Sequence, residues 1–237
     1  MSVLTEILAR IATERDRRPV LVFDLDSTLF STQERNHVIL HEFALDVGAP
    51  DDFQHALESI RPADMGWNIM DDLRKRGFGH EPTLSRLRQF WLARFFRDEY
   101  LRHDRPLPGA SEFVNACHAA GAIVYYLTGR DDPGMGRGTR MSLAMHGFPT
   151  EGPRVVTRLK PRFEDDDLDF KRQALEEIRG LGVVVACFEN EPANANLFHE
   201  AFPDAHILFL ETVHSPNPPP LNEGIVRLKD FRRAQGD

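Results

Sequence analysis

The chain has 237 residues, of which 41% are hydrophobic and 28% are charged, and its formal net charge at pH 7 is -8. This length suits one sizeable domain, or a core domain that carries a smaller insert. The acidic excess argues against a broad nucleic-acid-binding surface, which needs clustered lysines and arginines, and leaves room for a local cationic pocket that binds a small anion.

The N-terminal stretch over residues 3 to 15 predicts an amphipathic helix that packs on the core. Apolar residues recur there at helical spacing, without the continuous apolar region of a signal peptide. No apolar run approaches the roughly 18 residues that span a bilayer. The two cysteines, Cys117 and Cys187, lack metal-type spacing and are expected to be buried, reduced thiols. These features predict a cytoplasmic protein with no membrane partner.

A buried strand that ends in an acidic loop is the most informative feature of the sequence. The apolar run over residues 20 to 23 leads directly into Asp24, Asp26 and Thr28. Such runs suit interior strands of a parallel sheet, and ligands bind just beyond the carboxyl ends of these strands. Two carboxylates this close repel one another, so they need a cation, a protonated partner or both. The pattern favours a functional site over an ordinary acidic loop.

The next segment, from about residue 32 to residue 106, predicts a separate unit made of helices. Helical patterns cover residues 34–47, 51–59 and 84–102. The segment is too long for a simple crossover between two strands, and Pro106, Pro108 and Gly109 mark the return to the core.

The rest of the chain alternates short apolar strands with helices. The expected strands cover residues 122–127, 154–158, 183–188 and 206–210, and the expected helices cover residues 111–120, 138–146 and 170–179. A final strand and helix are expected between residues 224 and 233. This alternation predicts an α/β fold: a Rossmann-like parallel sheet with helices on both faces and right-handed crossovers.

Polar residues that could take part in binding or catalysis stand at the ends of these elements. Thr128, Gly129 and Arg130 follow the second strand, where a hydroxyl and backbone N–H groups would suit phosphoryl oxygens. Lys171 opens a helix, and its ammonium would offset the charge of the aspartate pair. Glu189 follows the strand that ends at residue 188, and a carboxylate there could hold a metal ion.

In this order, these motifs resemble those of the haloacid dehalogenase-like (HAD) superfamily of phosphatases and phosphotransferases. Asp24-Leu25-Asp26-Ser27-Thr28 resembles the first motif, whose first Asp is the nucleophile and whose second Asp is the general acid/base. Thr128 takes the second position and Lys171 the third, with Lys160 as a competing lysine. Glu189 takes the fourth position, where the family usually has Asp, and Glu191 and Asn194 are alternative or supporting ligands.

The resemblance implies a Mg2+-dependent phosphomonoester hydrolase with an aspartyl-phosphate intermediate and a small phosphorylated metabolite as substrate. It implies that Asp24, the backbone carbonyl of Asp26, and Glu189 hold the metal. The substrate phosphoryl group would meet Thr128, Gly129, Arg130 and Lys171. Residues 1–31 and 107–237 would form the core, and residues 32–106 a C1-type cap that closes over the strand ends.

Other functions remain open at this point. A phosphotransferase or phosphomutase would use the same residues, and a non-catalytic protein that binds a phosphate ligand is motivated by Glu189 in place of Asp. Dehalogenation is a minor option, because that reaction needs no acid at Asp26. Within the segment over residues 32–106, aromatic residues could line a substrate pocket, although helical spacing also suits a core: Trp67, Trp91, Phe95 and Phe96.

Overall fold

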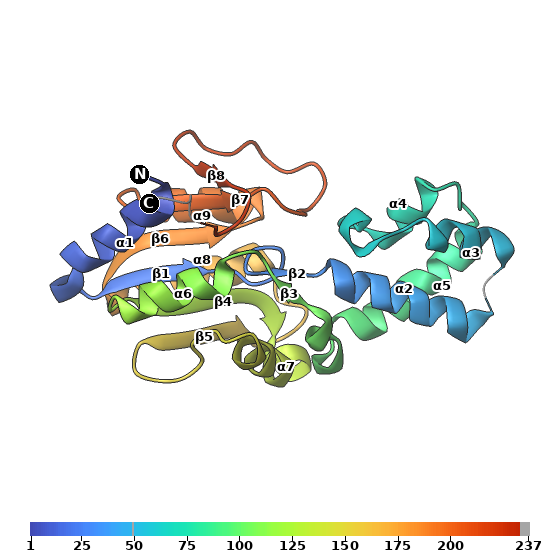
Figure 1. Cartoon of the computed structure of the whole chain (residues 1–237), viewed down its shortest axis with the longest axis horizontal. Coiled ribbons are helices and arrows are strands. Elements are labelled where there is room, and N and C mark those ends of the chain that lie inside the picture. The colour runs from blue at the N-terminus through green and yellow to red at the C-terminus, as the bar shows by residue number, and fades with distance from the viewer. Residues whose placement is uncertain (49, 233–237) are drawn as a thin grey trace.

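The computed structural model describes residues 1–48 and 50–232, and its centre is a six-stranded parallel sheet with the strand order β5-β4-β1-β6-β7-β8 (Figure 1). All five strand pairs in it are parallel, which confirms the predicted Rossmann-like α/β architecture. The strands are β1 Pro19–Phe23, β4 Ile123–Asp131, β5 Val155–Lys160, β6 Val183–Glu189, β7 His206–Leu210 and β8 Val226–Leu228.

Helices cover both faces of the sheet because successive side chains of each strand point to opposite sides. Leu21 and Phe23 of β1 pack in the hydrophobic cluster that contains α1 Val3–Thr13 and α6 Ala110–Ala119. Val20 and Val22 pack in the opposite cluster, with α8 Asp167–Leu181 and α9 Pro192–Ala201. Cys117 lies in the first cluster and Cys187 in the second, and both are buried.

A helical insert occupies the connection between two short antiparallel strands, β2 Phe30–Ser31 and β3 Arg105–Pro106. It comprises α2 Gln33–Val47, α3 Asp51–Glu58, α4 Ile69–Arg74, α5 Glu81–Phe95 and the 3-10 segments Pro62–Asp64 and Asp98–His103. Helices α2 to α5 lie together beyond the carboxyl end of β1 (Figure 1). They pack around a third buried cluster, which is separate from the two clusters of the sheet.

Two predicted helices of the insert and its surroundings have other limits in the structure. The expected helix over residues 84–102 is divided into α5 and the 3-10 segment Asp98–His103, and the short helix α4 was not expected. Helix α7, Asp132–Met145, begins six residues before the predicted start at residue 138. Its glycines weaken the helical pattern in the sequence, but a Cβ on Gly138 would lie 2.5 Å from the backbone oxygen of Asp98. Close packing against the insert therefore requires glycine there.

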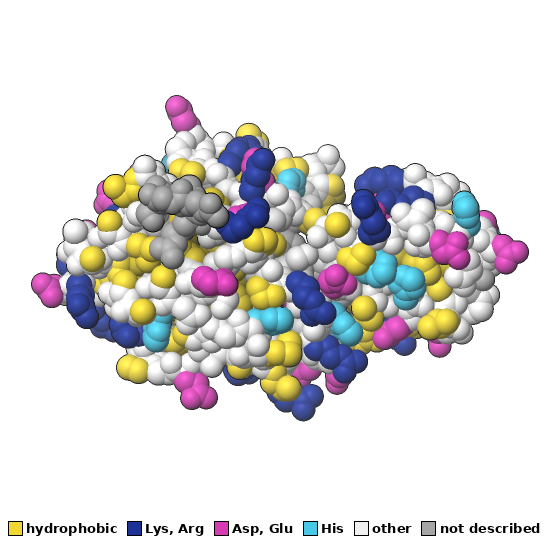
Figure 2. All heavy atoms as spheres, in the orientation of Figure 1, with side chains coloured by type: hydrophobic (Ala, Val, Ile, Leu, Met, Phe, Trp, Pro, Cys, Tyr) yellow, Lys and Arg dark blue, Asp and Glu magenta, His cyan; other side chains and the backbone are white. Residues whose placement is uncertain are grey.

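The C-terminal part differs from prediction in one respect. Strand β8 forms, but no helix follows it up to residue 232, and the end of the predicted helix lies outside the described residues. Within the described part of the chain, no helix is both long and apolar enough to cross a bilayer. On the face shown in Figure 2, lysine and arginine side chains are scattered among acidic and apolar ones.

Candidate active site

The carboxyl ends of the central strands and the helical insert enclose a cavity of about 790 Å3. Its lining contains all the residues that the sequence pattern singled out for the site: Asp24, Asp26, Thr128, Gly129, Arg130, Lys171, Glu189, Glu191 and Asn194. The competing lysine is absent from this lining. Lys160 instead donates to the backbone oxygens of Phe163 and Asp165. The geometry therefore favours Lys171 over Lys160 as the lysine of the site.

Asp24 belongs to a buried acid–lysine–acid arrangement in which Lys171 lies between Asp24 and Glu189. The ammonium of Lys171 donates to Asp24 Oδ1 at 2.9 Å and to Glu189 Oε2 at 2.6 Å. Burial raises the pKa of Asp24 to about 7, and Glu189 adds to the rise, although Lys171 acts in the opposite direction. The same two carboxylates hold the pKa of Lys171 above its usual range despite the desolvation of its ammonium. Lys171 is therefore a fixed positive charge beside Asp24.

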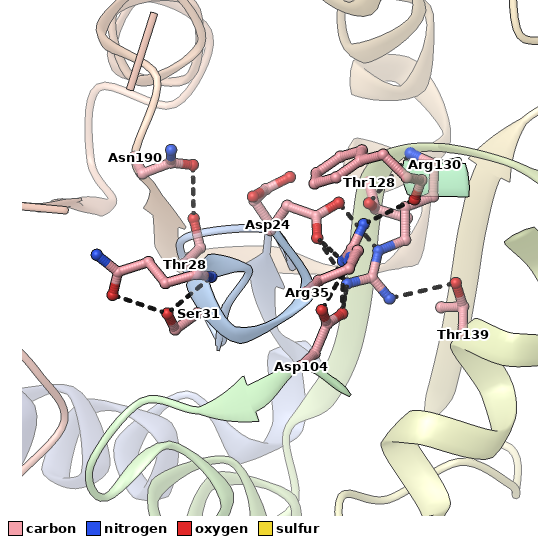
Figure 3. A network of polar contacts seen from close by, with 12 residues as sticks. Asp24, Thr28, Ser31, Arg35, Asp104, Thr128, Arg130, Thr139 and Asn190 are labelled. Atoms are coloured by element: carbon pink, nitrogen blue, oxygen red, sulfur yellow. Dashed lines mark hydrogen bonds and ion pairs between the residues drawn. The ribbon is translucent and has the colours of Figure 1, made fainter. Parts of the chain in front are cut away.

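Asp26 is held by two buried arginines from different parts of the fold. Arg130 of β4 donates to Asp26 Oδ2 at 3.0 Å through Nε and to Oδ1 at 2.7 Å through Nη2, and Arg35 of α2 donates to Oδ1 at 2.7 Å. Both guanidiniums also bind Asp104, which precedes β3 (Figure 3). We call Asp26, Arg35, Asp104 and Arg130 the arginine–aspartate cluster.

The arginine–aspartate cluster keeps Asp26 ionised. Burial alone would favour the neutral acid, but the charges and hydrogen bonds of Arg130 and Arg35 outweigh it and hold the pKa of Asp26 below its usual range. Sequence reasoning placed Arg130 near the site but missed Arg35 and Asp104. Nothing in the local pattern distinguishes these two, because they lie 69 residues apart and meet only where the insert joins the core.

Replacing Arg35 with methionine is expected to lower the free energy of unfolding by about 3 kcal/mol, because it leaves the buried carboxylate of Asp104 with one guanidinium instead of two. Urea denaturation measures this change. Arg86→Met is the matched control, since Arg86 is exposed on α5 and has no ion pair among the described residues. Equal stability of the two variants would show that the ion pairs of Arg35 contribute nothing to folding.

A turn within the loop and one contact to a distant segment hold the loop after β1 in place. Ser27 adopts a left-handed backbone conformation with φ 59°, and its N–H donates to the oxygen of Phe30 at 2.6 Å. Thr28 is buried and donates through Oγ1 to Asn190 Oδ1 at 3.0 Å. Strained backbone of this kind persists where the surroundings determine it. The loop therefore presents Asp24 and Asp26 in a fixed arrangement.

The oxygen donors of the site are of the type that a hard divalent cation prefers. Asp24 Oδ2 has no hydrogen-bond partner among residues 1–48 and 50–232 and belongs to a residue that lines the cavity. In Glu189, by contrast, both carboxylate oxygens already accept hydrogen bonds. Oε2 accepts from Lys171, and Oε1 accepts from the backbone N–H groups of Asn190 and Glu191. In the same described ranges, no three His, Cys, Asp or Glu side chains are grouped as a metal site.

A scan against protein-family models and a search of curated proteins found no match to the sequence. Solved structures do match, at low identity. A haloacid dehalogenase-like hydrolase from Burkholderia xenovorans matches with a TM-score of 0.53 and 16% identity, over 91% of this chain and 94% of that one. Protein tyrosine kinase A from Mycobacterium tuberculosis matches with a TM-score of 0.52 and 16% identity, over 89% and 93%.

A third similar structure is CbbY from Rhodobacter sphaeroides in complex with phosphate, with a TM-score of 0.50 and 14% identity over 90% of this chain and 94% of that one. These matches extend over the insert as well as the sheet, since each covers about nine tenths of both chains. The chain therefore has the haloacid dehalogenase-like fold.

Proposed function

We propose that this protein is a phosphomonoester hydrolase that transfers the phosphoryl group first to Asp24 and then to water. One observation carries the proposal. The buried carboxylate of Asp24, just beyond β1, accepts a hydrogen bond from Lys171 through Oδ1, and its Oδ2 has no partner among the described residues. Asp24 lines a large cavity. A fixed carboxylate beside a fixed cation suits attack on phosphorus, because the cation offsets the charge of the incoming phosphate.

In the first step, an oxygen of Asp24 bonds to phosphorus as the bond from phosphorus to the ester oxygen breaks. Lys171 and the hydroxyl of Thr128 would stabilise the phosphoryl oxygens, and the alcohol leaves with a proton. In the second step, water attacks the phosphorus of the aspartyl-phosphate, the bond from phosphorus to the Asp24 oxygen breaks, and inorganic phosphate leaves as the Asp24 carboxylate is regenerated. Dividing the displacement in two is the general advantage of covalent catalysis.

Asp26 would handle the protons. As an ionised carboxylate, it is suited to take a proton from the attacking water in the second step. To protonate the departing alcohol in the first step, Asp26 must first hold a proton, which solvent water supplies once the contacts to Arg130 and Arg35 weaken. Because Arg35 belongs to the insert and Arg130 to the sheet, movement of the insert would change these contacts. We propose that residues 32–106 act as a C1-type cap.

We further propose that the hydrolase uses Mg2+, held by Asp24 and the backbone carbonyl of Asp26, with Glu189 as the third ligand. The cation would supply Lewis-acid stabilisation of the phosphoryl oxygens. Oε2 of Glu189 accepts a hydrogen bond from Lys171. With this ligand set, Glu189 must therefore bind the cation and Lys171 together, or Lys171 must shift toward the substrate phosphate.

Removal of divalent cations with EDTA is expected to abolish phosphate release, and added Mg2+ to restore it. The apparent affinity for Mg2+ should rise as the pH passes upward through about 7, because burial raises the pKa of Asp24 to about 7 and ligation needs the ionised form. Phosphate release at several Mg2+ concentrations and pH values measures both effects. Undiminished activity in EDTA would contradict the proposed Mg2+ requirement and leave Lys171 as the main positive charge at the phosphoryl group.

A panel of phosphomonoesters tests the reaction class. Free phosphate without any added acceptor supports hydrolysis, whereas phosphate transfer that depends on an acceptor supports a phosphotransferase. A small phosphorylated substrate is favoured by the size of the cavity and by the CbbY structures, which hold phosphate and xylulose-(1,5)-bisphosphate. Tight binding of esters with no turnover of any kind would favour a non-catalytic phosphate-binding protein.

A further inference from the structure

The part of the cavity that the insert lines has an apolar wall that phosphoryl transfer does not require. This wall consists of side chains of the insert, chiefly Trp67, Met70, Trp91, Leu92, Phe95 and Phe96. Trp67 is 54% exposed and Leu92 is 43% exposed, so these two keep large apolar surfaces uncovered in the structure. Exposed apolar surface in a concave site is a common feature of ligand pockets.

Aromatic contacts fix one side of this wall. The rings of Trp91 and Phe95 stack at 4.6 Å, and Trp91 Nε1 donates to Asn36 Oδ1 at 2.8 Å. Phe96 packs against Phe163, which lies in the loop after β5, at 4.8 Å and an interplanar angle of 71°. Phe163 does not itself line the cavity, so this contact anchors Phe96 to the core and helps to fix the wall in place. A preformed surface binds a flat apolar group without a large ordering cost.

Most polar side chains of the insert that line the cavity already have partners in the structure. Arg74 binds Glu81 at 3.0 Å, and Asn68 Oδ1 accepts from the N–H of Met70 at 3.0 Å. Three of them, Thr32, Ser85 and Arg88, have side chains without a hydrogen bond or ion pair within the described ranges. A substrate rich in hydroxyl groups would thus find few free partners here, whereas an aromatic group would cover Trp67 and Leu92.

From these contacts we propose that the site takes phosphomonoesters whose alcohol part carries an aromatic ring, with Trp67 and Leu92 as specificity-determining residues. The inference rests on the proposed function for the position of the phosphate, which Lys171 and Thr128 would hold. Between that phosphate and the wall of the insert, the ring would lie beside Trp67 and exclude water from the cavity.

Direct binding tests this inference without turnover. The only two tryptophans of the chain, Trp67 and Trp91, both line the cavity, so intrinsic fluorescence reports on ligands there. The probes are 2-phenylethyl phosphate, glycerol 3-phosphate and inorganic phosphate, titrated with Mg2+ into the Asp24→Asn variant, with calorimetry as a second readout. The two esters carry the same charge and both derive from primary alcohols. We expect 2-phenylethyl phosphate to bind at least about tenfold more tightly than glycerol 3-phosphate.

Substitution of Trp67 tests the wall itself. In the same background, Trp67→Ala should weaken binding of 2-phenylethyl phosphate by about tenfold and leave inorganic phosphate unchanged, and Trp91 still reports. Leu92→Ser should act in the same direction. Met141→Ala is the control, because Met141 is an exposed apolar residue of α7 that does not line the cavity. Equal affinities for the two esters, or equal losses for all three ligands in Trp67→Ala, would overturn the inference.

Phosphate release by the wild-type protein separates this inference from the proposed function. Release from both esters with equal affinities would retain the hydrolase and refute the aromatic specificity. Selective binding of 2-phenylethyl phosphate without any phosphate release would refute the hydrolase and support the aromatic pocket as a binding site.

Discussion

Replacement of Asp24 with asparagine is expected to lower the rate of phosphate release by at least about 10^3-fold, because the variant lacks the carboxylate that attacks phosphorus. The fold should survive. Asparagine has nearly the same shape, and Lys171 keeps Glu189 as a partner at 2.6 Å. Steady-state kinetics on the best ester of the panel, with circular dichroism of both proteins, measures the loss and verifies the fold.

Asp132→Asn is the matched control for this variant. Asp132 lies just beyond the end of β4, but its side chain is 55% exposed, binds Arg140 and does not line the cavity. The control should keep wild-type activity. If the Asp24→Asn variant retained the same activity as this control, Asp24 would not be the nucleophile, and direct attack by water would replace the two-step mechanism.

Replacement of Lys171 with methionine is expected to affect both activity and stability. The turnover number should fall by about 10^2 to 10^3-fold, since a preorganised charge that faces the phosphoryl oxygens is removed. The free energy of unfolding should fall by about 3 kcal/mol or more, because Asp24 and Glu189 are left as buried carboxylates without a counterion. Urea denaturation and kinetics below the unfolding transition measure the two effects separately.

Lys160→Met is a demanding control, because Lys160 is also a buried lysine and stands 11 positions earlier in the chain. Its ammonium binds Asp167, which lines the cavity, at 2.7 Å and donates to two backbone oxygens outside it, but Lys160 itself does not line the cavity. We expect this variant to lose stability but to retain its turnover number. Wild-type turnover by Lys171→Met, or an equal loss of turnover in both lysine variants, would contradict the role given to Lys171.

The sheet could be predicted because its signals are local. Each buried strand is a short apolar run, and such runs next to helical patterns leave few alternatives to a parallel α/β sheet. The helices were less certain where tertiary contacts override propensity. Helix α7 contains Gly134, Gly136 and Gly138, which weaken a helical pattern, yet the close approach of Gly138 to Asp98 requires a residue without a side chain.

The same distinction applies to the site. The sequence pattern placed Asp24, Thr128, Lys171 and Glu189 together because each stands at the end of a strand or the start of a helix, and the ends of parallel strands meet at one edge. It could not place Arg35 and Asp104, which are brought to Asp26 by the packing of the insert on the core. Consequently, the contacts that hold the pKa of Asp26 below its usual range could not be predicted from the sequence.

The aspartyl-phosphate itself tests the central claim most directly. The wild-type protein would be mixed with an ester that it hydrolyses, quenched with acid within one turnover, and measured as intact mass, followed by peptide mapping. We expect a species heavier by one phosphoryl group, with the addition on Asp24 and none in the Asp24→Asn variant. Rapid hydrolysis with no phosphorylated protein at any quench time, or a phosphoryl group on another residue, would contradict that claim.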